Sequence, residues 1–530
     1  MQGPRVDRVI FWVALPLITG VSVPLVLFPV EGEALLSAAF GWLTRVLGWA
    51  YLWFTIAAFA LLVYYALGKY GNVRFGGPDA KPEFSLISWI AMIFCAGIGA
   101  SVLYWGTIEW AYYYMSPPFG LEPRSAEATE WAATYGLFHW GFTAWAIYCI
   151  PTLPLAYLFW NRQRPVLRMS AACEGVIGAQ AARSLPGKFI DMLFMFGLLG
   201  GVGTSIGLST PMISAGLSEI LGVARGYWLD ASVVITLGAI FGVSVYTGLQ
   251  RGIRMLSRFN LWLTIALLAF VFLAGPTLFI IDTITNSIGL LIQNFIKMSL
   301  YLDPIGKWGS LISASGEGSP GLQATPQATF PEQWTVFYWA WWIAFAPFMG
   351  LFVARISRGR TIRELIGAEI IGGAMGCWMF FAVLGNTSLF FQLEGSQDLT
   401  GLVARNMTPE AIIATVVAVG DRVIPFAIPL LLVFVTLAII FAATTLDSAS
   451  YILASVATRE QAEVREPARW HRCFWAVVLS SVALSLMFVG GTESLRAVQS
   501  ASLIVALPLI AVLVLMTLSF IRWLRQDHGA

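Results

Sequence analysis

Residues 334 to 342 read WTVFYWAWW, four tryptophans in nine positions within an apolar stretch of a chain that is hydrophobic almost throughout. Indole faces that cluster inside a membrane can bind an organic cation that has no N–H group to donate. The stretch therefore predicts both a membrane-embedded helix and an aromatic box on that helix.

The overall composition supports a membrane protein. The 530 residues are 58% hydrophobic and 11% charged, with a mean hydropathy of +0.76, whereas about 25% of a soluble domain is charged. The net charge of +2 gives no indication of a nucleic-acid partner. The five cysteines form no C-x-x-C pair, so neither a disulfide framework nor a metal site is expected. The first apolar run is too long for a signal peptide and is interpreted as a retained helix.

Apolar runs long enough to cross about 30 Å of hydrocarbon predict the membrane-spanning segments. There are twelve such runs, near residues 9–30, 48–68, 86–114, 131–158, 189–218, 227–248, 258–282, 334–354, 363–391, 423–456, 473–491 and 498–521. An apolar run at 284–300 is shorter and flanked by polar residues, which favours a helix lying at the outer interface.

The positions of the charges predict the orientation. Nineteen of the 31 Lys and Arg residues follow the second, fourth, sixth, eighth and tenth segments, and four more lie near the termini. The loops after segments three and nine contain acidic residues instead, among them Glu122, Glu127, Glu394 and Asp398. Because basic loops stay on the cytoplasmic side, both termini are predicted to be cytoplasmic, in the inner (plasma) membrane.

Two segments contain irregular stretches. Segment three has Gly97-Ile98-Gly99-Ala100-Ser101, and segment eight has Ala346-Pro347-Phe348-Met349-Gly350. Both stretches are predicted to unwind, and because they lie five segments apart they indicate two inverted five-helix repeats, segments 3–7 and 8–12, after two leading helices. The alternative is that small residues merely allow close helix packing.

Four stretches together resemble the betaine/carnitine/choline transporter family. They are the run 334–342 with its continuation ARISRGRTIRE at 354–364, the residues HWG at 139–141 with WAIY at 145–148, the glycine stretch of segment three, and FAATTLD at 441–447. The resemblance covers nearly the whole chain. It implies a carrier of onium compounds, built as inverted repeats and usually trimeric.

With this resemblance the chain divides into five regions. They are 1–84, with the two leading helices; 85–282, the first repeat; 283–332, the outer helix and loop; 333–523, the second repeat; and 524–530, a cytoplasmic tail too short for the tail-based osmosensing of some relatives.

The box is the predicted substrate site. Trp145 and Tyr148 are three residues apart and Trp341 and Phe345 are four apart, so each pair shares a helix face. The predicted substrate-binding residues are Trp140, Trp145, Tyr148, Trp341, Trp342 and Phe345, with Gly97, Gly99 and Ser101 as the unwound gating stretch. The alternative for each of these rings is the interfacial belt or ordinary packing. Phe345 departs from the Trp or Tyr usual in the family, and Ser101 departs from its Gly or Asp.

Sodium is the predicted coupling ion, and no other cofactor is expected. Hydroxyls and free carbonyls are suitable ligands for a small hard cation. The predicted ligands are Phe441, Thr444 and Thr445, with the carbonyls of Cys95 and Ile98, and a second sodium ion near Thr204, Ser205 and Phe348. The alternative is that the Thr hydroxyls only bond carbonyls of their own helix.

Glu109, His139 and Asp447 are ionisable groups within predicted spans, where such groups are functional candidates by default. A structural role is the commoner one.

The sequence thus predicts a sodium-coupled, alternating-access importer for a betaine, choline, carnitine or dimethylsulfonium compound. The partners are substrate, sodium, lipid and two further copies of the chain. A sodium-independent exchanger of the same family is the first alternative. An integral-membrane enzyme or receptor is a remote one, because no nucleophile motif, His/Cys cluster or soluble domain is present.

Overall fold

The protein is helical throughout the part of the chain that the computed structural model describes, residues 6–164, 166–247, 249–308, 328–423, 426–458, 467–489, 499–501 and 503–529. Across these ranges the only β-pairing is two isolated bridges. The predicted all-α class is therefore confirmed.

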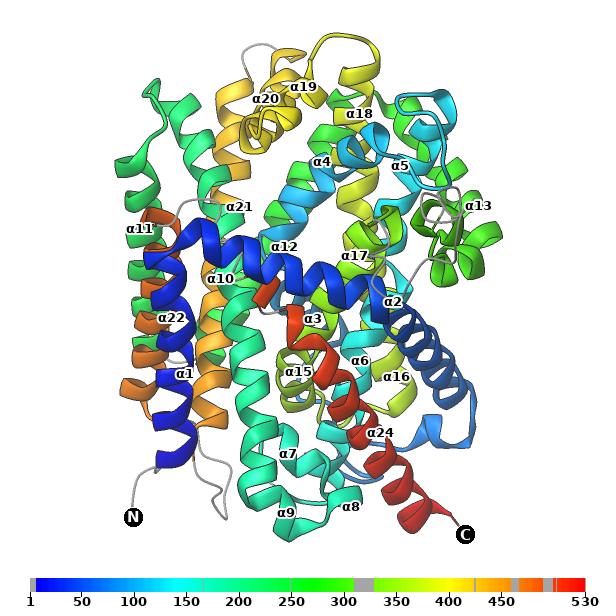
Figure 1. Ribbon diagram of the computed structural model, residues 1–530, viewed down its shortest axis with the longest axis vertical. Coiled ribbons are helices and arrows are strands. Elements are labelled where there is room, and N and C mark those ends of the chain that lie inside the picture. Colours follow the sequence, from blue (N-terminus) through cyan, green and yellow to red (C-terminus); the bar gives the residue numbers. More distant parts are fainter. Residues whose placement is uncertain are drawn as a thin grey trace, which may run out of the picture.

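The first half of the chain contains most of the long helices (Figure 1). They are α1 (Arg8–Leu27), α2 (Pro29–Leu67), α3 (Leu86–Ile98), α4 (Ser101–Met115), α5 (Ala126–His139), α6 (Phe142–Ala156) with the π-turn η2 (Tyr157–Asn161), α10 (Leu185–Leu221), α11 (Tyr227–Thr247), α12 (Leu249–Ala274) and α13 (Thr277–Leu300). Short helices α7 (Met169–Ala172), α8 (Glu174–Ile177) and α9 (Ala179–Arg183) precede α10, and η1 (Lys69–Asn72) follows α2.

The second half begins with η4 (Pro331–Val336) and α15 (Phe337–Ile356). A capping box between Thr361 and Glu364 starts the next segment, which alternates α-helix and π-turns. Its parts are α16 (Ile362–Gly367), η5 (Ala368–Gly372), α17 (Gly373–Phe380), η6 (Phe381–Gly385) and α18 (Asn386–Leu393). They are followed by α19 (Leu399–Ala404), α20 (Thr408–Asp421), α21 (Ala427–Val456), α22 (Arg469–Val489) and α24 (Ala506–His528).

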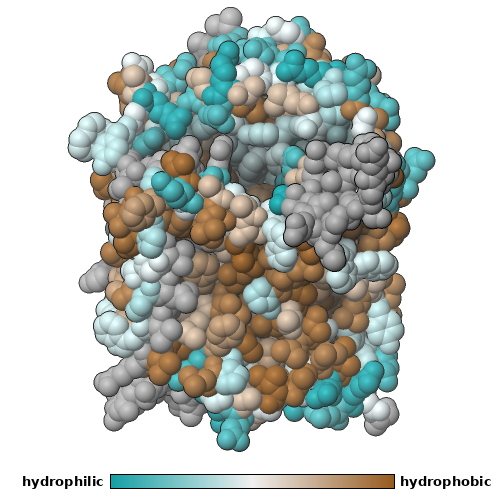
Figure 2. All heavy atoms as spheres, in the orientation of Figure 1, coloured by the Kyte–Doolittle hydropathy of each residue, from teal (hydrophilic) through white to brown (hydrophobic). Residues whose placement is uncertain are grey.

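Within the described ranges, eight helices are long and apolar enough to cross a membrane, or nine if the bent pair α3 and α4 counts as one span. Eight of the twelve predicted segments coincide with these candidates, and the other four fall on α1, α11, α12 and α22. Figure 2 shows apolar residues in a band around the middle of the molecule and hydrophilic residues at both ends. The protein is therefore an integral membrane protein.

The structure corrects two predicted boundaries. Helix α2 starts at Pro29. Residues 31–47, which lie between the first two predicted segments, are therefore helical. Glu31 and Arg45 interrupt the apolar run there without breaking the helix. The seventh segment, predicted at 258–282, ends at Ala274, because Pro276 cannot donate a backbone hydrogen bond. Residues 277–300 form α13, which is longer than the predicted interfacial helix and qualifies by length and apolarity as a candidate span.

Contacts between loops bring the predicted cytoplasmic segments to one end of the molecule. Phe75 N–H donates to Arg360 O (2.9 Å), which joins the loops after segments two and eight. Arg162 of the loop after segment four donates to Asp527 beyond segment twelve (3.0 Å). At the opposite end in Figure 1 lie α19 and α20, beside the acidic loop after segment nine. This separation matches the alternation of basic and acidic loops in the sequence.

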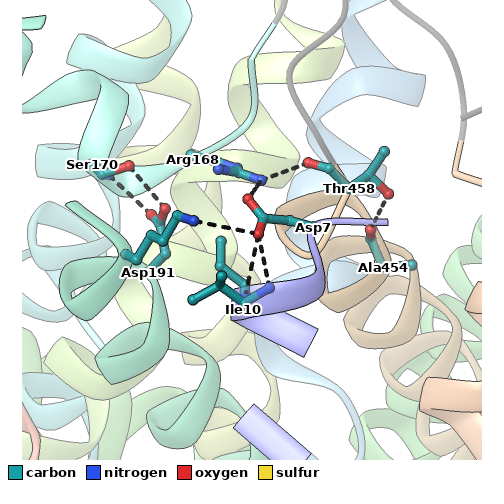
Figure 3. A network of polar contacts seen from close by, with 9 residues as sticks. Asp7, Ile10, Arg168, Ser170, Asp191, Ala454 and Thr458 are labelled. Carbon is teal, nitrogen blue, oxygen red and sulfur yellow. Dashed lines mark hydrogen bonds and ion pairs between the residues drawn. The ribbon is translucent and has the colours of Figure 1, made fainter. Parts of the chain in front are cut away.

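A network of polar contacts fixes the start of α1, at the end of the molecule that holds the predicted cytoplasmic loops (Figure 3). Asp7 is the N-cap of α1 and accepts hydrogen bonds from Val9 and Ile10. Arg168 Nη2 lies 3.1 Å from the Asp7 carboxylate and also donates to Thr458 O (2.7 Å). Burial alone would raise the pKa of Asp7, but Arg168 and the more distant Lys188 outweigh it and hold this pKa below the usual Asp range. This network thus joins the start of α1 to α10 through Lys188, to the loop after segment four through Arg168, and to the end of segment ten through Thr458.

We predict that Asp7→Asn lowers the stability of the protein by about 1–2 kcal/mol at pH 7, because it removes a partly buried, charge-assisted hydrogen bond. The folded-state pKa is depressed, so this contribution is complete above the ordinary Asp pKa and disappears as the pH falls through the folded value. The thermal unfolding midpoints in detergent should therefore differ at pH 7, and the difference should shrink as the pH is lowered below the ordinary Asp pKa. Glu394→Gln is the control, since its ion pair with Arg422 is about one-third exposed and contributes little. Equal midpoints for Asp7→Asn and wild type at pH 7 would contradict the prediction.

Candidate functional site

The first element of the site is the break between α3 and α4. The two helices meet at an angle of 62° around Gly99, which has a φ of +56°. A Cβ at Gly99 would collide with the hydroxyl oxygen of Thr445, so α21 packs directly on the broken backbone. The stretch predicted to unwind at 97–101 does contain a helix break, and it is confined to Gly99 and Ala100.

The predicted unwinding of residues 346–350 is wrong. Helix α15 runs without interruption through Pro347. A proline removes one backbone hydrogen bond but does not have to end a helix that its neighbours support. Here Gly350 brings α15 close to Pro151 and Leu155 of α6, and the whole stretch is buried.

A second break, which the sequence did not predict, separates α5 from α6 at Trp140 and Gly141. Trp378 Nε1 donates to Leu137 O (2.8 Å), so the side chain of another segment satisfies a carbonyl next to the break. Trp140 is thereby placed at a kink rather than on a regular helix. The only signal in the sequence is the glycine that follows it.

The aromatic rings of α6 and α15 converge, as predicted. The Trp342 ring centroid lies 4.5 Å from that of Tyr148 and 5.6 Å from that of Trp140. Trp140 and Trp341 are 6.4 Å apart and nearly perpendicular. These rings are all buried, which excludes the interfacial-belt interpretation for them.

The rings line a small cavity, in which about 30 Å³ is open to the centre of a water molecule. It is lined by Gly97, Ile98, Ser101, Trp140, Tyr148, Ser205, Tyr338, Trp341, Trp342, Phe345 and Thr445. Five of the six predicted substrate-binding residues are in this lining. Trp145 is not: it packs behind the cavity, 5.7 Å from Tyr148 and 6.0 Å from Trp342.

Tyr338 is the lining residue that sequence reasoning missed. Its ring stacks on Trp341 at 6.0 Å, and its hydroxyl donates to Glu109. The spacing of three residues from Trp341 was a signal, since it puts both rings on one face of α15.

Two of the five predicted ligands of the first sodium ion, Ile98 and Thr445, line the same cavity, and Cys95, Phe441 and Thr444 do not. Thr444 and Thr445 both donate to Phe441 O, at 2.9 and 3.1 Å, as the alternative interpretation expects. A hydroxyl that donates its proton still has lone pairs free to accept. Thr445 and Ile98 both line the cavity, whereas Cys95 is buried within α3.

The residues predicted for a second ion point to different spaces. Ser205 lines the aromatic cavity, and its hydroxyl is 3.4 Å from that of Ser101. Thr204 lines a second, larger cavity of about 400 Å³ and donates to Gly200 O (2.9 Å). Phe348 is buried beside Phe345, with ring centroids 6.3 Å apart.

The second cavity lies toward the end of the molecule that carries α19 and α20. Its lining includes Tyr104, Trp105, Trp334, Phe337, Arg225, Asn406 and Thr408. Trp341 lines the smaller cavity, and its ring lies 5.9 Å from that of Phe337, which lines the larger one.

A bundle of apolar helices with a broken helix and a buried polyaromatic cavity defines a membrane transporter. The sequence profile of the betaine/carnitine/choline family of transporters matches residues 9–529, and the chain belongs to this family. It is 36% identical over 474 residues to the uncharacterised transporter YeaV of Escherichia coli K12, covering 89% of this chain and 92% of YeaV. It is 31% identical over 490 residues to a carnitine transporter of Acinetobacter baumannii, covering 92% of this chain and 83% of that protein. The protein is accordingly a transporter and not an enzyme.

We predict that Gly99→Ala abolishes uptake, because a positive φ costs an alanine about 1–2 kcal/mol and the new methyl group would displace Thr445. Gly203→Ala is the matched control, since a Cβ there meets nothing within 4 Å. Uptake of labelled substrate by cells that express equal amounts of each variant tests this. Full uptake by Gly99→Ala would show that the break does not require glycine.

Proposed function

We propose that this protein imports a small onium compound of the betaine, choline, carnitine or dimethylsulfonium type by alternating access. The single observation that carries the proposal is the buried cavity walled by Trp140, Tyr148, Tyr338, Trp341 and Trp342. A trimethylammonium or dimethylsulfonium head cannot donate an N–H hydrogen bond, so aromatic faces are its best partners, each contributing about 0.5–2 kcal/mol when water is excluded. None of the described lining residues is Lys or Arg, so no positive charge opposes such a head.

The two cavities support an alternating-access route. The larger one gives access from the end that carries α19 and α20. The space open to water is much smaller in the cage than in the larger cavity, so we propose that the rings move apart when the substrate binds. Trp341 lines the cage and lies next to Phe337, which lines the larger cavity, so it is well placed to couple this movement to closure of the route.

We infer sodium symport from the position of the hydroxyl pair. Thr445 packs against Gly99, where the broken helix leaves carbonyls without helical partners. Carbonyl oxygens of segment three and the lone pairs of Thr444 and Thr445 would then face one small cation. The carbonyls of Cys95 and Ile98 remain the proposed backbone ligands, and a second ion near Thr204, Ser205 and Phe348 is a weaker part of the same proposal because those side chains diverge.

Helix packing supports the proposed inverted repeats. Exchanging each segment with the one five places away should leave the set of packed pairs unchanged. Helix α12 packs on α3 and α21, and its counterpart α24 packs on α15 and α10. Likewise α21 packs on α3, and α10 packs on α15. This packing supports two five-helix repeats within twelve crossings. From the charges of the loops and the family resemblance we further propose that both termini are cytoplasmic and that the protein is a homotrimer in the plasma (inner) membrane.

We predict that Trp342→Leu weakens substrate binding by at least about tenfold, because it removes the ring that contacts both Tyr148 and Trp140. Binding is measured by the quenching of tryptophan fluorescence on titration with glycine betaine, choline, L-carnitine and dimethylsulfoniopropionate. Trp228→Leu is the control, since that indole is 82% exposed. Unchanged affinity of Trp342→Leu for a compound that the wild type binds would remove Trp342 from the site.

The double variant Thr444→Ala, Thr445→Ala is predicted to bind the coupling sodium ion more weakly, so that the sodium response of uptake into proteoliposomes is lost at the concentrations that saturate the wild type. The sodium concentration for half-maximal uptake should rise by at least about tenfold, equivalent to about 1.4 kcal/mol of lost ion binding. Thr415→Ala is the control, because Thr415 is equally buried and makes the same kind of bond to its own helix. The alternative mechanism gives a different result. If the wild type takes up substrate without a sodium gradient, and only into proteoliposomes preloaded with substrate, it is an exchanger.

A further inference from the structure

The cage rests on a buried carboxyl group in α4. Glu109 is fully buried and does not line the cavity. Its Oε2 atom accepts hydrogen bonds from Trp140 Nε1 (2.9 Å) and from the Tyr338 hydroxyl. One oxygen atom therefore holds two walls of the cage, which come from segments four and eight.

The other carboxyl oxygen of Glu109, Oε1, also accepts a hydrogen bond. Tyr113, one turn along α4, donates to Oε1 at 2.5 Å. The Tyr113 hydroxyl is also 2.8 Å from His139 Nδ1, and His139 Nε2 is 3.0 Å from the Thr335 hydroxyl. His139 stacks on Tyr338 with ring centroids 4.8 Å apart. Every member of this network is buried, so the carboxyl group has little freedom to turn.

The position of the two rings matters for a cation. Attraction to an aromatic ring is strongest over its face and is lost at its edge. Trp140 and Tyr338 are 5.8 Å apart at 67°, and both donors are anchored at the polar edge of their ring, so the hydrogen bonds to Glu109 do not cover a ring face. One face of Tyr338 packs on His139. An acceptor oxygen at that edge also polarises the ring toward greater negative charge on its face.

We propose that Glu109 is the positioning residue of the cage: it fixes the angle of Trp140 and Tyr338 and strengthens their attraction for the onium head. The proposal deepens the proposed function and rests on it. A purely structural role would require only that the buried donors be satisfied, and it predicts no link between Glu109 and ligand affinity.

The chain offers a matched control in Glu369 of η5. This carboxyl group is as fully buried as Glu109, and its Oε1 accepts a hydrogen bond from Thr152 (3.1 Å), which does not line the cavity. Replacing either Glu by Gln changes the same atoms in an equally dry environment. Only the change at Glu109 alters the anchor of the cage.

The experiment compares Glu109→Gln and Glu369→Gln in full-length protein, with the same four compounds and the fluorescence titration described above. We expect Glu109→Gln to weaken binding by about tenfold or more, with a shift of the tryptophan emission maximum, while Glu369→Gln stays within about twofold of wild type. Uptake should show the change in KM rather than in the maximal rate. Glu109→Asp, which keeps the carboxyl group but shortens its reach, should weaken binding in the same direction and replaces Glu109→Gln if that variant does not fold.

A double-mutant cycle with Tyr338→Phe separates positioning from general destabilisation. Because the two groups share one hydrogen bond, Glu109→Gln should weaken binding less in the Tyr338→Phe background than in wild type. Additive effects, or equal affinity of wild type and Glu109→Gln, would overturn the proposal. A failure of the proposed function would look different from a failure of the Glu109 proposal. In that case the wild-type protein would bind none of the four compounds, which would overturn both proposals.

Discussion

The hydrocarbon core of a membrane holds no water that could bond the backbone. A helix can therefore break there only where other protein groups hydrogen-bond or shield the backbone N–H and C=O groups that the break exposes. The site of this transporter is built at two such places. At Gly99 the exposed backbone is covered by Thr445 of α21, and at Gly141 the indole of Trp378 supplies a donor to Leu137 O. Each break depends on a helix from the other half of the chain, which ties the site to the packing of the two halves.

The aromatic cage follows from the same packing. Helices α6 and α15 approach closely because Gly350 lies against Pro151 and Leu155. That close approach brings Tyr148 and Trp342 into ring contact. Electrostatic attraction to a ring face is stronger in a site that excludes water than in water. A ligand held between contacting rings changes their spacing, so the proposed mechanism links binding to conformational change.

Much of this arrangement could be predicted from the sequence, because the signals were local. Runs of apolar residues located the helices, and the basic loops predicted which ends lie together. Residues 97–101 and 346–350 gave similar local signals, yet only the first stretch breaks. The difference arises from tertiary contacts: Gly99 has a positive φ against Thr445, whereas Pro347 lies in a helix supported along its length. Glu109 and Tyr338 were beyond sequence reasoning as a pair, since 229 residues separate the two ends of their hydrogen bond.

The contrast between α3–α4 and α15 bears on how an inverted-repeat carrier can couple an ion to a substrate. Several packed pairs recur when segments are exchanged five places along the chain, as the proposed repeats require: α12 packs on α21 as α24 packs on α10, and α21 packs on α3 as α10 packs on α15. The backbone does not share this symmetry, because segment three is bent by 62° and segment eight is continuous. Carbonyls freed by a break are therefore offered by the first repeat, while α15 of the second contributes most of the aromatic wall. An ion and an onium head bound at this site would each bridge both repeats, and this shared dependence on the interface is a physical route by which binding of one favours binding of the other.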